Sequence, residues 1–221
     1  MKRNVWLMIM WLTAAGSSVL ARDSDVWNQG ELVLMNGTEL KGDIDYNWKA
    51  GVVQYREGNK IRAYSAYQVR AFRYFDDHQN VLRKFVTFDY ADKSGSRQRP
   101  LFLEEVVMGS LPVYREVRSV HEPIKLKNLS MFNSDKELVK DLANFTYLVL
   151  LNGELINLNL FYRAMWPALK EKYEAELNRY AMRIQSDIAP TLLQLMLINQ
   201  YNYLTQHQTE EQESNRPVGR E

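Results

Sequence analysis

Three aromatic side chains near predicted turns are the residues best suited to bind a ligand. Trp48, Tyr64 and Tyr67 belong to an aromatic-rich stretch between residues 46 and 90. An aromatic ring beside a turn can stack on a sugar, or line a groove for an extended peptide. Aromatic residues are also favoured strand formers and supply the core, so we assign most of this stretch to packing. Trp48, Tyr64 and Tyr67 are kept as candidate ligand-binding residues.

Asp43 and Asp45 are the carboxylate pair whose spacing could support acid–base chemistry. On a strand, residues two apart share a face at roughly 6–7 Å, a separation that would suit glycoside hydrolysis. The two acids alternate with Ile44 and Tyr46, however, and that alternation is typical of a solvent-facing strand surface. The neighbouring pair Glu104 and Glu105 is interpreted in the same way, as part of a strand edge.

Motifs for metal, cofactor or nucleophilic chemistry are missing from the sequence. His78, His121 and His207 share no helical or strand spacing, and Asp76-Asp77-His78 is interpreted as a solvated turn. The sequence contains no H-E-x-x-H, no G-x-S-x-G, no glycine-rich phosphate loop and no cysteine. We therefore predict no catalytic residues, no metal and no cofactor, and we lean against an enzyme.

The first 21 residues have the pattern of a signal peptide. Lys2 and Arg3 form a basic start, residues 5–12 are apolar, and small residues lead to Val19-Leu20-Ala21. The alternative is an uncleaved membrane anchor, but the apolar run is well below the ~20 residues that span a bilayer. We predict cleavage and export, to the periplasm or to the cell surface or extracellular space, with no transmembrane span afterwards.

Charge and cysteine usage limit the partners of the exported chain. The formal net charge of +1 becomes −1 when Lys2 and Arg3 are removed, and this near-neutral balance argues against nucleic acid. The absence of cysteine excludes disulfides and a lipoprotein anchor. An envelope protein, a glycan or a second copy of the chain remain as possible partners.

The pattern of residues 22–118 predicts an antiparallel β domain. It begins with a hairpin over residues 31–46, for which Asn36-Gly37 predicts a type I′ turn. Short strands follow about every ten residues with polar turns between them, a pattern typical of a meander or a small barrel.

The second half of the chain changes from strand to helix periodicity. Residues 119–144 are interpreted as a connection, residues 145–205 as a β-hairpin with two antiparallel helices, and residues 206–221 as a disordered polar tail. The first helix has an apolar stripe at Leu169, Tyr173, Leu177, Tyr180 and Ile184, which we expect to pack on the sheet. The predicted fold class is therefore α+β.

The segments GELVLMNGTELKGDIDY, YSAYQVRAFRYFD, FLEEVVMGSLPVYREV and NQYNYL resemble those of uncharacterised exported proteins of the Bacteroidota. This resemblance covers most of residues 29–204 and depends on turn and core residues. It implies export to the periplasm or surface, and it supplies no catalytic residues.

The leading functional hypothesis is an exported, non-catalytic module that binds a protein or an envelope component. One alternative is a glycan-binding or glycan-acting protein that uses exposed aromatics with Asp43 and Asp45. Another is a structural homodimer formed through the helix pair.

Overall fold

The computed structural model describes residues 27–48, 50–77, 79–91, 98–117, 142–184 and 188–214. Within these ranges the protein is α+β, as predicted: a ten-stranded antiparallel sheet is followed by two C-terminal helices that pack on it. The predicted signal peptide, most of the predicted connection and residues 215–221 lie outside the described ranges.

All ten strands belong to a single sheet. They are β1 (Asn28–Leu34), β2 (Glu39–Asn47), β3 (Val52–Glu57), β4 (Lys60–Ser65), β5 (Val69–Asp76), β6 (Val81–Ala91), β7 (Gln98–Val107), β8 (Val113–Val117), β9 (Phe145–Leu151) and β10 (Glu154–Asn157). Their order is β10-β9-β8-β7-β6-β5-β1-β2-β3-β4. β1 lies between β2 and β5, so the chain departs from a plain meander there. β8 pairs with β9, so the second hairpin continues the first sheet.

The two Asn-Gly sequences form different turns. Asn152 and Gly153 both have positive φ and connect Leu151 directly to Glu154, as expected for a type I′ turn. The type I′ turn predicted at Asn36-Gly37 is wrong, because only Gly37 has a positive φ. There the Gly37 N–H donates to the Leu34 carbonyl, and the loop has three residues. This loop is one residue longer than a type I′ loop. Three-residue hairpin loops typically form a type I turn followed by a residue with positive φ, and Gly37 is that residue here.

The sheet coils strongly, so that β2 reaches across its concave face to β6 and β7. The Tyr46 ring centroid lies 4.9 Å from that of Phe85 and 5.8 Å from that of Phe102. β2 is separated from both partner strands in the sheet order by β1 and β5. The sheet ends at β4 and β10 and does not close into the small barrel that the sequence offered as one alternative.

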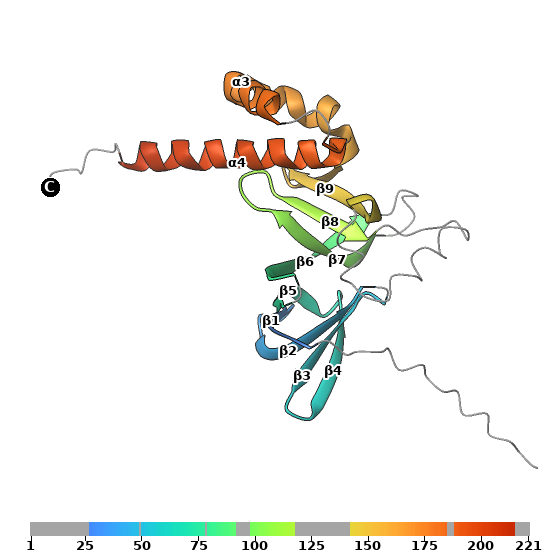
Figure 1. Cartoon of the computed structure of the whole chain (residues 1–221). Helices are drawn as coiled ribbons and strands as arrows, with labels where there is room; N and C mark the ends of the chain where they lie inside the picture. Colours follow the sequence, from blue (N-terminus) through green and yellow to red (C-terminus); the bar gives the residue numbers. More distant parts are fainter. Residues whose placement is uncertain are drawn as a thin grey trace, which may run out of the picture.

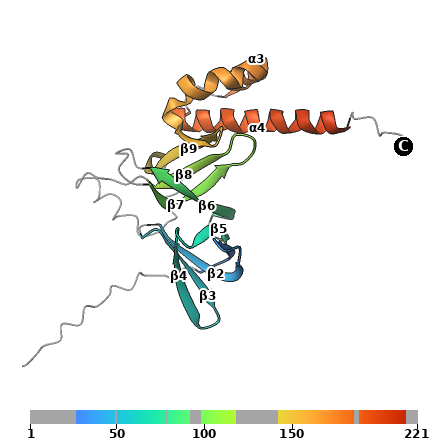
Figure 2. The same ribbon diagram turned by 180° about the vertical axis from the view of Figure 1, so that it is seen from behind.

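Two helices cover the C-terminal part of the sheet. After the short turns η2 (Leu158–Leu160) and η3 (Phe161–Met165), the chain forms α3 (Trp166–Arg183) and α4 (Pro190–Ser214). In Figure 1 and Figure 2, α4 lies between α3 and the sheet, and the β3–β4 hairpin lies at the opposite end of the molecule. α4 continues beyond Leu204 to Ser214, into the segment that the sequence assigned to a disordered tail.

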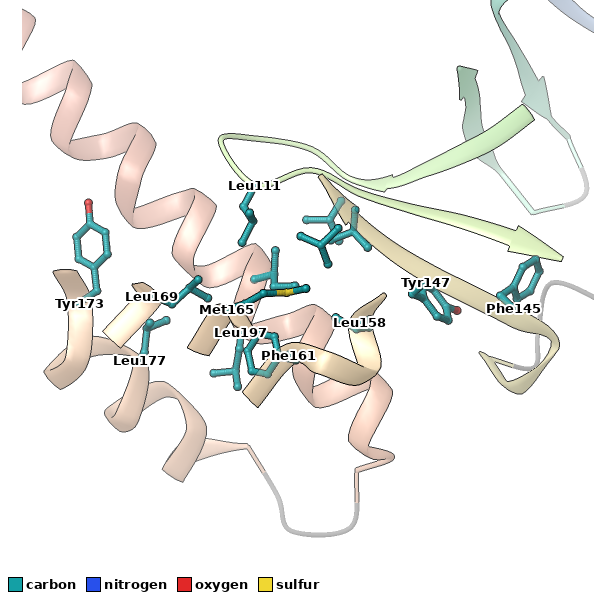
Figure 3. Close-up of a cluster of buried hydrophobic side chains, with 14 residues drawn as sticks. Leu111, Phe145, Tyr147, Leu158, Phe161, Met165, Leu169, Tyr173, Leu177 and Leu197 are labelled. Carbon is teal, nitrogen blue, oxygen red and sulfur yellow. The ribbon is translucent and has the colours of Figure 1, made fainter. Parts of the chain in front are cut away.

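The helices and the sheet share one apolar core. The predicted stripe of α3 is buried at Leu169, Tyr173 and Leu177, and α4 contributes Leu197 and Ile198. Figure 3 shows Leu169, Leu177 and Leu197 of the helices gathered on one side, with Phe145 and Tyr147 of β9 further along the sheet. This core therefore extends from the helices toward the middle of the concave face.

Candidate functional site

The three candidate aromatic residues lie in different surroundings. Trp48 follows the end of β2 and is partly buried against the helix-covered core. Tyr64 on β4 packs against the separate core of the N-terminal strands. Tyr67, in the turn after β4, is 71% exposed. The structure therefore does not assemble them into one aromatic platform.

Trp48 lines a small pocket in the middle of the concave face, which neither Tyr64 nor Tyr67 reaches. The pocket has a volume of about 90 Å³. Aromatic rings and charged side chains from five strands share its lining, which consists of Tyr46, Trp48, Arg83, Phe85, Phe102, Glu104, Arg115, Glu116, Val117 and Phe145. It lies where the coiled N-terminal strands meet the part of the sheet that the helices cover.

Four charged residues form a largely buried cluster at this pocket, and three of them, Arg83, Glu104 and Arg115, line it. Arg83 donates from Nε to Glu104 Oε1 at 2.8 Å and from Nη2 to Glu104 Oε2 at 3.0 Å. Arg115 donates from Nε to Glu104 Oε2 at 2.7 Å. Asp76 lies 3.7 Å from Arg83. We call Asp76, Arg83, Glu104 and Arg115 the charged cluster.

Strand register brings the charged cluster together. Glu104 on β7 stands directly opposite Arg115 on β8, and opposite Phe85 on β6. Arg83, two residues before Phe85, shares its face and is diagonal to Glu104, within reach of a long side chain. Each charged residue is therefore in phase with the aromatic residues of the concave face.

Glu104 is held in its ionised form. Burial alone would raise its pKa, but the charges and hydrogen bonds of Arg83 and Arg115 outweigh that effect and place the pKa below its ordinary value. The residue as a whole is only 6% exposed. The interpretation of Glu104 as part of a strand edge is therefore wrong: β7 is an interior strand, and Glu104 faces the concave side.

Arg115 is oriented by two contacts of different kinds. Glu104 binds its Nε, and its guanidinium carbon lies 4.2 Å from the centroid of the Phe145 ring. A cation stacked on an aromatic face is stabilised electrostatically. Among the described residues, the two terminal nitrogens of Arg115 make no hydrogen bond. Arg115 therefore presents a fixed fork of donors at the pocket.

Asp43 and Asp45 lie outside this pocket. Asp43 accepts hydrogen bonds from Arg56 at 2.6 and 2.9 Å and from Gln29. Asp45 is buried, contrary to the solvent-facing surface predicted for it. Asp43 instead forms a cross-strand ion pair with Arg56, and Glu31 forms another with Arg73 at 2.6 Å.

Asp76, the first residue of the Asp76-Asp77-His78 motif, forms an ion pair with Arg83. Over the described ranges, no group of three His, Cys, Asp or Glu side chains could hold a metal ion. His78 and His121 lie outside those ranges.

Sequence reasoning missed Arg83, Glu104 and Arg115. The sequence did contain a signal for them. Arg83 and Phe85 are two residues apart, as are Phe102 and Glu104, so each charged residue shares a strand face with an aromatic one. On a buried face, charged residues in phase with aromatic ones on neighbouring strands indicate internal ion pairing.

No family model, curated protein or solved structure matches this chain. No helix within the described residues has the length and apolar character needed to cross a membrane. The fold and the site define an α+β protein with a coiled antiparallel sheet, a two-helix cover and a charged pocket on the concave face.

Proposed function

We propose that the chain is an exported, non-catalytic binding module, and that the pocket between Trp48 and Arg115 receives part of a protein or envelope component. The observation that carries this proposal is the ion-paired group of Arg83, Glu104 and Arg115, which lines a pocket with aromatic walls. Export is inferred from the signal-peptide pattern of residues 1–21.

Energetics support a binding role for the charged cluster. Removing charges from water costs several kcal/mol per ion, and replacing a buried ion pair with apolar residues is often neutral or stabilising. Packing alone would therefore not require Arg83, Glu104 and Arg115 at the centre of this face. An apolar concave site with a few convergent polar groups is the usual form of a ligand pocket.

The arrangement of Glu104 favours binding over catalysis. Its two oxygens accept three hydrogen bonds from two arginines, and its lowered pKa keeps it ionised. A general acid–base group needs a pKa near the working pH, whereas Glu104 is shifted away from it. The carboxylate therefore serves to orient the two arginines.

Glycan binding is the second candidate function, and Trp48 favours it. Trp48 lines the same pocket as Arg115 and Glu104, which combines a ring for stacking with groups that can hydrogen-bond hydroxyls. The third hypothesis is homodimerisation through the helix pair, whose apolar stripes were expected to pack on the sheet. Those stripes pack within the chain, so a dimer would have to use other residues of α3 and α4.

Crosslinking in the native envelope followed by capture of the full chain tests the leading proposal. Wild type would be compared with Trp48→Ala, which opens the pocket, and with Tyr67→Ala, which removes an exposed ring outside it. We expect one partner to be recovered with wild type and Tyr67→Ala and lost with folded Trp48→Ala. Recovery of only monomeric, unpartnered wild type would overturn the proposal.

Calorimetry with soluble glycans tests the second candidate, again with Trp48→Ala as the control. Saturable heat that disappears in this variant would support glycan binding, and no heat with any glycan would end that hypothesis.

A further inference from the structure

We propose that the pocket is a receptor for a carboxylate group, which the terminal nitrogens of Arg115 bind. This inference rests on the proposed binding function and adds the chemical class of the ligand. It begins with how Arg115 is held. Its Nε donates to Glu104 at 2.7 Å and its guanidinium carbon lies over the Phe145 ring, 4.2 Å from the centroid, so the terminal nitrogens are positioned before any ligand arrives.

The geometry of a guanidinium selects its partner. Two parallel N–H donors match the two oxygens of a carboxylate or phosphate, which makes a bidentate pair both strong and directional. Within the described part of the chain no acceptor binds the terminal nitrogens of Arg115, although Arg115 lines the pocket. The side chain is only 11% exposed, so an acceptor in the pocket would bind it largely out of water.

The charge around the pocket favours a carboxylate over a phosphate. In the charged cluster, two arginines are balanced by Asp76 and Glu104. A ligand with one negative charge would therefore bind beside a cluster whose own charges cancel, where the terminal nitrogens of Arg115 are already positioned as donors. A dianion would approach Glu104 and Glu116, which also lines the pocket, and would be repelled more strongly.

Pocket size and lining indicate which part of the ligand enters. A volume of about 90 Å³ holds only a few heavy atoms, given that one water needs roughly 10–15 Å³ on a comparable measure. The carboxylate and the atoms next to it fit, with their carbons against Trp48 and Phe102, and the rest of the ligand remains outside. The same group occurs on acidic sugars and at peptide chain ends.

The test compares acids with their neutral amides on the full-length protein at constant ionic strength. The probes are glucuronate against glucuronamide, N-acetylglycine against N-acetylglycinamide, and inorganic phosphate. Two-dimensional NMR would follow the Arg115 Nε–H and the Trp48 indole N–H. We expect at least one acid to shift both signals saturably and to bind about tenfold or more tightly than its amide. The acid that binds more tightly identifies the source.

Two arginine variants separate the pocket from general charge. Arg115→Gln should weaken binding of the acid about tenfold or more, whereas Arg73→Gln, which removes an arginine outside the pocket, should bind it as wild type does. Equal binding of acid and amide, tighter binding of phosphate, or unchanged binding by Arg115→Gln would each overturn the proposal. The comparison of acid with amide in wild type needs no variant, so it decides the matter even where Arg115→Gln fails to fold.

The outcome is separable from that of the proposed function. If no acid binds while a partner is still captured through Trp48, the carboxylate assignment fails alone. If neither acids nor a captured partner depend on the pocket, both proposals fail.

Discussion

Gly109, in the turn between β7 and β8, lies directly against Asn202 of α4. A Cβ at position 109 would be 2.6 Å from Cγ of Asn202. The side-chain amide of Asn202 makes four hydrogen bonds to this turn. Its Oδ1 accepts from the Leu111 N–H at 2.8 Å and from the Ser110 hydroxyl at 3.1 Å. Its Nδ2 donates to the carbonyls of Met108 and Leu111, both at 3.0 Å. One side chain thus joins the helix pair to the sheet.

Asn202→Ala should destabilise the protein by about 2–3 kcal/mol, because it leaves buried backbone groups of Leu111 without partners. The free energy of unfolding, measured in urea, checks this. Asn199→Ala is the matched control, since Asn199 is exposed on the same helix, and it should change the free energy by less than about 0.5 kcal/mol. Equal effects of the two variants would show that the Asn202 bonds contribute nothing net.

Gly109→Ala should also destabilise the protein, by about 2–3 kcal/mol, for two reasons. Gly109 has φ of +134°, a conformation that side chains rarely adopt, and the new Cβ would contact Asn202. Gly58→Ala is the control for a positive φ without a steric contact: Gly58 has φ of +58° and open space around it, so the substitution should cost only about 1–2 kcal/mol, the cost of a left-handed conformation.

The double variant Gly109→Ala/Asn202→Gly isolates the contact itself. Glycine at position 202 removes both Cβ and Cγ of Asn202, which would lie 2.7 and 2.6 Å from the added methyl. The combined cost should therefore be smaller than the sum of the costs of Gly109→Ala and Asn202→Gly by at least about 0.5 kcal/mol. Strict additivity in urea unfolding would contradict the close approach.

Local patterns were sufficient to predict the elements of this fold. Turn residues and alternation predicted the strands, and the spacing of Leu169, Tyr173 and Leu177 predicted a helix with one buried face. These signals are local, because each depends on residues within a few positions of one another. The α+β class follows from their order along the chain.

The site required information that local patterns lack. Arg83, Glu104 and Arg115 meet only because β6, β7 and β8 are neighbours in a particular register, and Trp48 meets them only because the sheet coils. The contact between Asn202 and Leu111 joins segments far apart in sequence. Glu104-Glu105 illustrates the difficulty: one acid faces the pocket and the other the opposite side, and the sequence alone presents them as equivalent.

Tyr46 should be the side chain that holds the coil of the sheet. Its ring centroid lies 5.1 Å from that of Phe72, and it also contacts Phe85 and Phe102. Because Tyr46 is only partly buried, Tyr46→Ala should cost about 2–3 kcal/mol, less than a fully buried aromatic, whereas Tyr46→Phe keeps the ring and should cost about 1 kcal/mol or less. Tyr67→Ala should change little, because Tyr67 is exposed. Thermal unfolding followed by near-ultraviolet circular dichroism measures all three, and a small loss for Tyr46→Ala would argue against this role.

Glu104 should make the stability of the protein depend on pH in the acid range. Its ordinary pKa is 4.5, and its pKa in the folded protein is lower. Between the two values the unfolded chain binds more protons, so the free energy of unfolding rises with pH there. The contribution of Glu104 is therefore fully present above about pH 4.5. It is lost as the pH falls through the pKa of the folded state.

Glu104→Gln tests this contribution because glutamine cannot ionise. At pH 7 the variant should be less stable than wild type by about 3–5 kcal/mol, since Arg83 and Arg115 lose their shared carboxylate. Below about pH 4.5 the difference should shrink, because wild type loses the same interaction on protonation. Glu105→Gln, on the opposite face of β7, should retain the pH profile of wild type. Urea unfolding at a series of pH values measures all three proteins, and parallel profiles for Glu104→Gln and wild type would show that the two arginines do not depend on an ionised Glu104.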